Sequence, residues 1–157
     1  MDFDVPKIDE LLNLEQLDTN IFRGKGVFSG LQRTYGGQVA AQSLSAATKT
    51  VDADKVVHSL HSYFIRPGKS DQDTIFMVDR VRDGRSFATR LVHAIQDGET
   101  IFSLEASFHI TNDVGIEHSD KMREVPPPED VIPLEQTGGP LKFFSCLLYT
   151  SPSPRDS

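Results

Sequence analysis

The stretch YGGQVAAQSLSAATKT, residues 35–50, decides the fold. It opens on the paired glycines Gly36 and Gly37 and continues as a run of small residues, in which Val39 and Leu44 are the bulky ones. We predict a helix over Tyr35–Thr50. Because small residues give weak amphipathic contrast, this helix should touch its surroundings on all sides instead of lying on the outside of the fold.

The chain after this helix is typical of β-structure. Asp83-Gly84 and Asp97-Gly98 each separate two β-rich runs, and Asp-Gly is the strongest short-range hairpin signal. We therefore predict an antiparallel meander, in an α+β fold with one long central helix wrapped by the sheet. The four predicted strands are Val56–Ile65, Thr74–Val81, Arg85–Ile95 and Thr100–Thr111.

Two further elements are expected before the central helix. The spacing of apolar residues over Ile8–Leu17 predicts a short amphipathic helix. Asn20–Phe28 predicts a first strand, weakened by its glycines. In the strand after the central helix, alternation places His58 on a mostly apolar face with Val56, Leu60 and Phe64, and His61 on the opposite face with Tyr63.

Composition and charge exclude several classes of function. A net charge of −7 argues against a nucleic-acid partner, which would need a basic surface. The single cysteine, Cys146, allows neither a disulfide framework nor a cysteine metal cluster, and the five histidines show no metal-ligand spacing. We expect no metal site and no cofactor. With no apolar run of about 18 residues, we also expect no membrane span and a cytoplasmic protein.

Several short motifs, taken in order, carry a family resemblance. Together they resemble the N-terminal half of the type II acyl-CoA thioesterases, whose members carry two fused hotdog folds. The resemblance runs from about Leu11 to the proline-rich segment Gly115–Pro128, which resembles the family's linker. The motifs are Phe22-Arg23-Gly24, Tyr35-Gly36-Gly37-Gln38-Val39, Val57-His58-Ser59-Leu60-His61-Ser62-Tyr63-Phe64, Arg66-Pro67-Gly68, Arg82-Asp83-Gly84-Arg85-Ser86-Phe87, Ala94-Ile95-Gln96-Asp97-Gly98 and Ala106-Ser107-Phe108.

The resemblance implies a division of the chain. Residues 1–112 are expected to form one hotdog domain, and residues 113–145 a linker with the start of a missing second hotdog. Residues 146–157, CLLYTSPSPRDS, are unlike the family and resemble translated library-adapter sequence, so we expect a disordered, non-native tail. If the source is eukaryotic, the peroxisome is the alternative location.

The implied activity is hydrolysis of fatty acyl-CoA to a free fatty acid and CoA. In the family, an Asp, a Thr or Ser and a Gln of the second hotdog are thought to activate the water, so none of these carries over to this chain, and inactivity of the isolated half is an expected outcome. Here the candidate catalytic residue is His58, which could orient a water or polarise the carbonyl. A satisfied core histidine is the alternative, favoured roughly three to one.

The candidate substrate-binding residues form two groups. Tyr35, Gly36, Gly37 and Gln38 begin the central helix, where free N–H groups attract negative charge; the alternative, a simple tight turn into the helix, has about even odds. Arg85, Ser86 and Phe87 follow the first Asp-Gly pair and would shape an acyl or pantetheine channel; a plain hairpin start is favoured about two to one. A cationic fringe for the nucleotide phosphates would come from Arg66, Lys69, Arg80, Arg82 and Arg85, although ordinary surface is the simpler interpretation.

Two other functions stay open. The first is a non-catalytic acyl-CoA-binding and assembly domain. The second, a hotdog hydratase, is disfavoured because no Asp or Asn pairs with a His at short spacing. In either case a lone hotdog exposes a sheet edge or face, so we expect a homo-oligomer formed by hotdog pairing.

Overall fold

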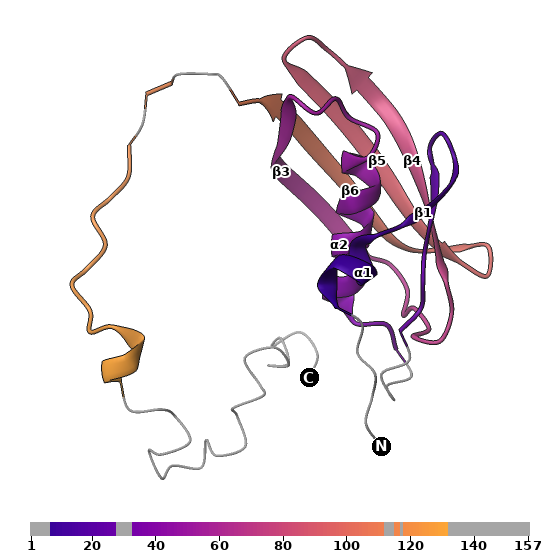
Figure 1. Ribbon diagram of the computed structural model, residues 1–157, viewed down its shortest axis with the longest axis horizontal. Coiled ribbons are helices and arrows are strands. Elements are labelled where there is room, and N and C mark those ends of the chain that lie inside the picture. Colours follow the sequence, from indigo (N-terminus) through magenta and orange to yellow (C-terminus); the bar gives the residue numbers. More distant parts are fainter. Residues whose placement is uncertain (1–6, 28–32, 112–114, 117, 132–157) are drawn as a thin grey trace. The chain divides into compact units, whose positions relative to one another are not determined.

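The computed structural model describes residues 7–27, 33–111, 115–116 and 118–131. An antiparallel sheet and one long helix dominate the described chain (Figure 1). The elements are α1 (Ile8–Leu12), β1 (Glu15–Asp18), β2 (Ile21–Gly24), α2 (Gly36–Thr48), β3 (Lys55–Phe64), β4 (Thr74–Asp83), β5 (Phe87–Gln96), β6 (Glu99–Ile110) and the 3₁₀ turn η1 (Pro128–Asp130).

The sheet confirms the predicted meander. Its order is β1-β2-β4-β5-β6-β3 and every neighbouring pair is antiparallel. Strands β4, β5 and β6 follow one another through the two Asp-Gly sites, whereas β3, the first strand after α2, crosses to the far edge beside β6. One backbone side of β3 therefore has no strand partner among the described residues.

The two Asp-Gly sites form different turns. Asp97 and Gly98 have φ of 50° and 77°, which gives the two-residue turn with two left-handed positions that suits a tight hairpin. The loop after Asp83 is longer. There the Gly84 amide donates to the Phe87 carbonyl at 2.8 Å, and the Ser86 carbonyl accepts from the Ile110 amide at 3.1 Å.

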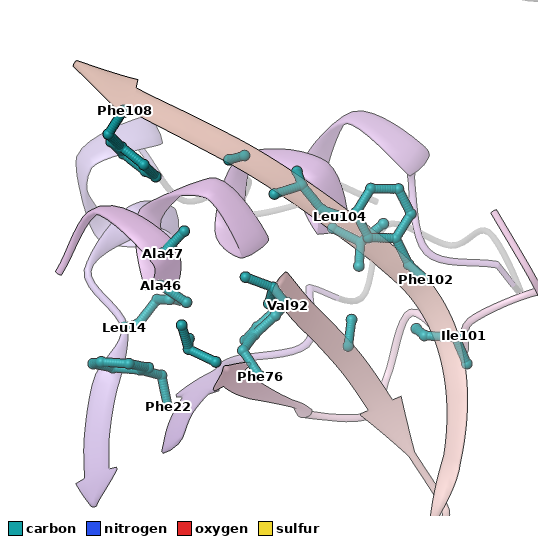
Figure 2. Packing of buried hydrophobic residues seen from close by; sticks show 14 of the residues in the cluster. Leu14, Phe22, Ala46, Ala47, Phe76, Val92, Ile101, Phe102, Leu104 and Phe108 are labelled. Atoms are coloured by element: carbon teal, nitrogen blue, oxygen red, sulfur yellow. The ribbon is translucent and has the colours of Figure 1, made fainter. Parts of the chain in front are cut away.

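Helix α2 lies across one face of the sheet and contacts strands β2 to β6 (Figure 1). Its small residues allow a close approach, because Ala46 and Ala47 are buried against the inner face (Figure 2). That face supplies most of the core, with side chains Phe22, Phe76, Val92, Phe102, Leu104 and Phe108. The α+β class with a sheet around one helix is therefore confirmed.

The prediction that α2 is enclosed on all sides is wrong. Ala41, Leu44 and Ser45 are half-buried and Thr48 is exposed. These residues, together with α1, line an open groove on the side of the helix away from the sheet. Helix α2 has thirteen residues, and its surface is larger than the area that the sheet and the five-residue helix α1 can cover together.

The predicted N-terminal helix is also too long. In the structure, helix α1 ends at Leu12, because the backbone of Asn13 has non-helical dihedral angles of φ −80° and ψ 78°. Leu14 then turns into the core, and β1 pairs with β2. Pairing with an existing strand outweighs the weak preference of a short helix. The predicted strand Asn20–Phe28 is confirmed over Ile21–Gly24, and Phe28 lies outside the described residues.

A bulge in β3 overturns the predicted faces of that strand. Pairing with β6 shifts register between Val57 and Ser59, which leaves His58 as the extra residue. Before the bulge Val56 pairs with His109 on the outer face, whereas beyond it Leu60 pairs with buried Ala106 on the helix side. Strict alternation of side chains between the two faces of a strand cannot predict this change of face, because the bulge adds one residue to β3.

The chain divides into two compact units at Val114 and Gly115. The described part of the second unit holds the single 3₁₀ turn η1. Its apolar side chains Ile116, Met122, Val125 and Val131 are exposed, so this part has no core of its own.

Candidate functional site

The paired glycines that open α2 each lie under an aromatic ring. A Cβ on Gly36 would meet the ring of Phe64 at 3.0 Å, and one on Gly37 would meet the ring of Tyr35 at 2.5 Å. Neither glycine has positive φ, so left-handed backbone is not what requires them. Close approach of two rings to the bare backbone accounts for the pair.

The positive end of the α2 dipole is also not neutralised by a side chain of the first turn. Tyr35 supplies no side-chain cap, and the first turn holds no acidic residue. The amides of Gln38 and Val39 donate back to the Tyr35 carbonyl at 3.0 and 3.4 Å. Within the described part of the chain, the amides of Gly36 and Gly37 have no acceptor. Such an end attracts negative charge.

A pocket of about 420 Å³ lies beside this helix end. Its walls come from the residues before α2, from the end of β3 and the loop after it, and from the start of β6. Apolar side chains dominate, with two guanidinium groups at the rim. The lining residues are Arg33, Thr34, Gly36, Val39, Phe64, Ile65, Arg66, Pro67, Gly68, Ile101 and Phe102.

Phe64 forms the outer wall of the pocket. Its ring packs on Phe102, with ring centroids 4.9 Å apart, yet the residue is 65% exposed. Arg66 is fixed nearby, since it donates to the Thr100 carbonyl at 2.8 Å and pairs with Glu99 at 3.0 Å. The pocket is thus a partly open apolar cleft with a fixed cation at its rim.

His58 lies elsewhere, on the outer face of the sheet. The prediction that it faces an apolar core is wrong: the imidazole is exposed at the bulge, and its Nε2 lies 2.9 Å from Ser107 Oγ. The rings of Phe87 and His109 stack beside it with centroids 4.3 Å apart, and His58 meets them edge-on at 6.0 and 6.1 Å.

The predicted substrate-binding residues therefore form two separate groups. Tyr35, Gly36 and Gly37 lie at the pocket end of α2, and the Gln38 side chain donates to the Lys25 carbonyl at 3.5 Å. The segment Arg85–Phe87 lies at the other end of the sheet. Phe64 pairs with Phe102 and Phe87 with His109, so about 24 Å of β6 separates the two groups.

Two of the five residues of the proposed cationic fringe are paired with carboxylates. Lys69 lies 2.7 Å from Asp97, and Arg66 pairs with Glu99. The hydrogen bonds from Lys69 and Gln72 lower the pKa of Asp97. Arg80 donates to Asn20 Oδ1 at 2.9 Å. Over the described ranges Arg82 and Arg85 have no ion-pair partner, and no cluster of His, Cys, Asp and Glu could hold a metal.

Two buried polar residues escaped the sequence reasoning. Arg90 is 1% exposed on the helix side of β5 and donates to the carbonyls of Thr50, Arg82 and Thr89 at 2.9 Å each, and to the Asp83 carboxylate. The second is Gln96, at the pocket end of the same strand. Both lie at inward-facing positions of β5, in line with Ala88, Val92 and Ala94. A polar residue at such a position in an otherwise apolar row is the sequence pattern that could have identified them.

Comparison with known proteins fixes the family. A family model described as the acyl-CoA thioesterase N-terminal domain matches residues 26–109, more than half of the chain. This chain belongs to the acyl-CoA thioesterase N-terminal domain family. The match includes α2, strands β3 to β5, all of β6 except its last residue, and all eight of the predicted site residues.

Relatives of this thioesterase domain are known from sequence and structure. Acyl-coenzyme A thioesterase 8 of Homo sapiens is 41% identical over 128 residues, which are 82% of this chain and 40% of that protein. The structure of the acyl-CoA thioesterase II TesB2 from Mycobacterium marinum is 52% identical, with a TM-score of 0.73, over 80% of this chain and 47% of that one. The chain thus spans less than half the length of these relatives.

The comparisons also confirm the fold. A hot dog fold protein from Alicyclobacillus acidocaldarius is 28% identical, with a TM-score of 0.67 over 79% of this chain and 47% of that one. The acyl-CoA thioesterase domain is therefore a hotdog, as the resemblance implied. None of its helices, over the residues that the structure describes, is long and apolar enough to cross a membrane.

Proposed function

We propose that this chain supplies the N-terminal hotdog of an acyl-CoA thioesterase, which hydrolyses fatty acyl-CoA to a free fatty acid and CoA. One observation carries the proposal: the matched family segment includes every residue that lines the apolar pocket at the start of α2. Apolar clefts with a few polar groups are the usual binding sites for ligands of this kind. The negative charge of the chain does not argue against this substrate, because Arg33 and Arg66 line the pocket, although Arg66 is already paired with Glu99.

In this proposal the pocket binds and polarises the substrate. Phe64 and Ile101 would contact the acyl or pantetheine chain, and the amides of Gly36 and Gly37 would face the thioester carbonyl oxygen. A helix end in water contributes only about 0.3–1 kcal/mol to an anion, whereas an oxyanion donor in a dry site contributes about 2.7–4 kcal/mol. Substrate or a second domain must therefore cover the pocket before these amides can accelerate hydrolysis.

His58 stays our candidate catalytic residue, on the condition that a second hotdog completes its site. It lies on the outer face, six residues along β3 from Phe64, so it cannot reach the pocket of its own chain. We propose that it acts at a site completed by a second hotdog. Changing His58 to alanine in the assembled protein should lower turnover without changing stability, and unchanged turnover would exclude the role. Phe87, whose ring meets that of His58 edge-on, and the adjoining residues Arg85 and Ser86 would line the substrate channel of that same site.

Pairing of hotdogs is supported by the free edge of β3. This ten-residue strand carries the exposed side chains Val57, Leu60 and Phe64 next to its unpaired backbone. Long apolar edges are normally covered in native proteins. We propose that a second hotdog, from another copy or from a following domain, pairs along β3.

The limits of the domain and its location complete the proposal. We place the hotdog at residues 1–112, the linker and the start of a second hotdog at 113–145, and a non-native tail at 146–157. The end of the family match at residue 109 supports the first boundary. We place the protein in the cytoplasm, or in the peroxisome of a eukaryotic source.

The alternative function is a hotdog that binds acyl-CoA and assembles with a catalytic half, without chemistry of its own. It is favoured by the separation of His58 from the pocket. Release of CoA thiol by the isolated chain separates the two functions. Turnover that falls when His58 or Gly36 is changed supports the enzyme, whereas binding of a non-hydrolysable acyl-CoA thioether without turnover supports the binding domain.

A further inference from the structure

The end of the β5–β6 hairpin holds the loop of residues 65–73, which joins β3 to β4. Gln96 is 5% exposed at the end of β5. Its amide nitrogen donates to the carbonyls of Lys69 and Gln72 at 3.0 and 3.1 Å and to Thr74 Oγ1 at 3.0 Å. Its amide oxygen accepts from the Lys69 amide at 2.8 Å. One side chain thus fixes the loop backbone at two residues.

The neighbouring residue holds the same loop from the solvent side. Asp97 accepts from Lys69 Nζ at 2.7 Å and from Gln72 Nε2 at 2.6 Å. Both bonds favour the carboxylate, and the pKa of Asp97 is lowered accordingly.

The loop in turn positions the entrance to α2. The Thr34 amide donates to the Gly68 carbonyl at 2.8 Å, and Thr34 Oγ1 donates to the Lys69 carbonyl at 2.8 Å. Space is tight, since a Cβ on Gly68 would lie 2.9 Å from Ile101 and 3.3 Å from Gln96 Oε1. A continuous set of hydrogen bonds therefore leads from Gln96 through the loop to Thr34, the residue before the N-cap of α2.

Hydrophobic packing does not hold this loop. Over residues 65–73 the one buried side chain is that of Ser70, and Ile65 is exposed. Segments with little apolar burial open locally at low free energy unless hydrogen bonds restrain them. The shape of the pocket wall therefore depends on polar contacts, which can be removed without emptying the core.

We propose that Gln96 and Asp97 are positioning residues, which hold the Arg66–Gly68 wall of the pocket against the start of α2 so that acyl-CoA meets a preformed cleft. This inference rests on the proposed function of the pocket. Neither side chain lines the pocket, so both act through the loop.

The test compares two variants with a matched control. Gln96→Met keeps the length of the side chain and removes its polar atoms, and Asp97→Asn removes only the charge at an exposed site. Gln42→Met is the control, because Gln42 is equally buried, donates to the Leu11 carbonyl at 3.0 Å and does not line the pocket. Hydrogen exchange at the amides of Thr34 and Lys69, global stability, and affinity for an acyl-CoA thioether are measured for each.

We expect Gln96→Met to speed exchange at Thr34 about tenfold beyond its global destabilisation and to weaken thioether binding about tenfold. Asp97→Asn should give a smaller loss of about threefold in affinity. Gln42→Met should change neither the exchange rate at Thr34 nor the thioether affinity by more than its effect on global stability explains. Should Gln96→Met fail to fold, Asp97→Asn decides by the same two measurements.

Two outcomes overturn the inference alone. Wild-type protein that binds the thioether, with exchange at Thr34 unchanged by both Gln96→Met and Asp97→Asn, would show that these residues do not hold the loop. Faster exchange with undiminished affinity would show that the loop does not shape the site. A wild-type chain that does not bind the thioether would instead refute the proposed function, and the inference with it.

Discussion

Alanine at Gly36 separates the stability of the helix from the shape of the pocket. The added Cβ would lie 3.0 and 3.1 Å from two carbons of the Phe64 ring. That is a few tenths of an ångström too close, and the exposed ring can tilt away at a cost below about 1 kcal/mol. Alanine has a higher helix propensity than glycine, and this difference stabilises the variant by up to about 1 kcal/mol. We expect the free energy of unfolding in urea to change by less than about 1 kcal/mol.

Binding should respond more strongly than stability. The methyl group of Gly36→Ala enters the pocket and moves Phe64, which forms its outer wall. We expect the affinity for an acyl-CoA thioether, measured by calorimetry, to fall about tenfold, equivalent to about 1.4 kcal/mol.

The double variant Gly36→Ala with Phe64→Leu is the control for this prediction. If the ring causes the loss, the two changes will be non-additive, with a coupling of about 0.5 kcal/mol or more. Additive losses, or a Gly36→Ala variant destabilised by more than about 2 kcal/mol, would refute the reasoning.

Three further predictions concern stability, pH and assembly. Arg90→Met leaves the carbonyl and hydroxyl of Thr50 without their donor, so unfolding in urea should become easier by about 3 kcal/mol, and a loss below about 1 kcal/mol would contradict the network. The pKa of Asp97 is lowered from 3.8 by the hydrogen bonds from Lys69 and Gln72, so its contribution is complete above pH 3.8 and is lost as the pH falls through the lower folded-state pKa. Wild type should therefore exceed Asp97→Asn in stability near neutral pH, and in urea titrations this difference should shrink as the pH falls below 3.8; a constant difference would exclude the ion pair as its source. Leu60→Lys places a charge on the free edge of β3, where it should reduce self-association seen by light scattering, and an unchanged mass would exclude pairing along that edge.

Much of the fold could be predicted from the sequence. The turn signals Asp83-Gly84 and Asp97-Gly98 predicted the meander, and the small residues of 35–50 predicted a helix close to a sheet. Local chemistry sets these features, since a tight hairpin needs residues that tolerate positive φ. The wrong predictions concern the end of α1, where β1 pairs with β2, the bulge at His58, where β3 pairs with β6, and the open groove along α2.

The candidate site was less accessible to sequence reasoning. The two glycines were singled out correctly, but one of the rings that explain them, that of Phe64, comes from the end of β3, 28 residues later in the chain. The distance between this end and Phe87 follows from the register of β6, which no local pattern reveals. Gln96 was hidden for the same reason, because its partners lie 22 to 27 residues earlier in the chain.

The location of bound acyl-CoA tests the central claim most directly. An acyl-CoA thioether with a photoreactive group in its acyl chain would be bound to the chain, irradiated, and the labelled peptides identified by mass spectrometry. We predict labels within 33–39, 64–68 and 101–102, the segments that line the pocket, and we expect unlabelled thioether to compete these labels away. Labels confined to surfaces other than this pocket and the proposed channel at Arg85–Phe87, or labels that no competitor removes, would contradict it.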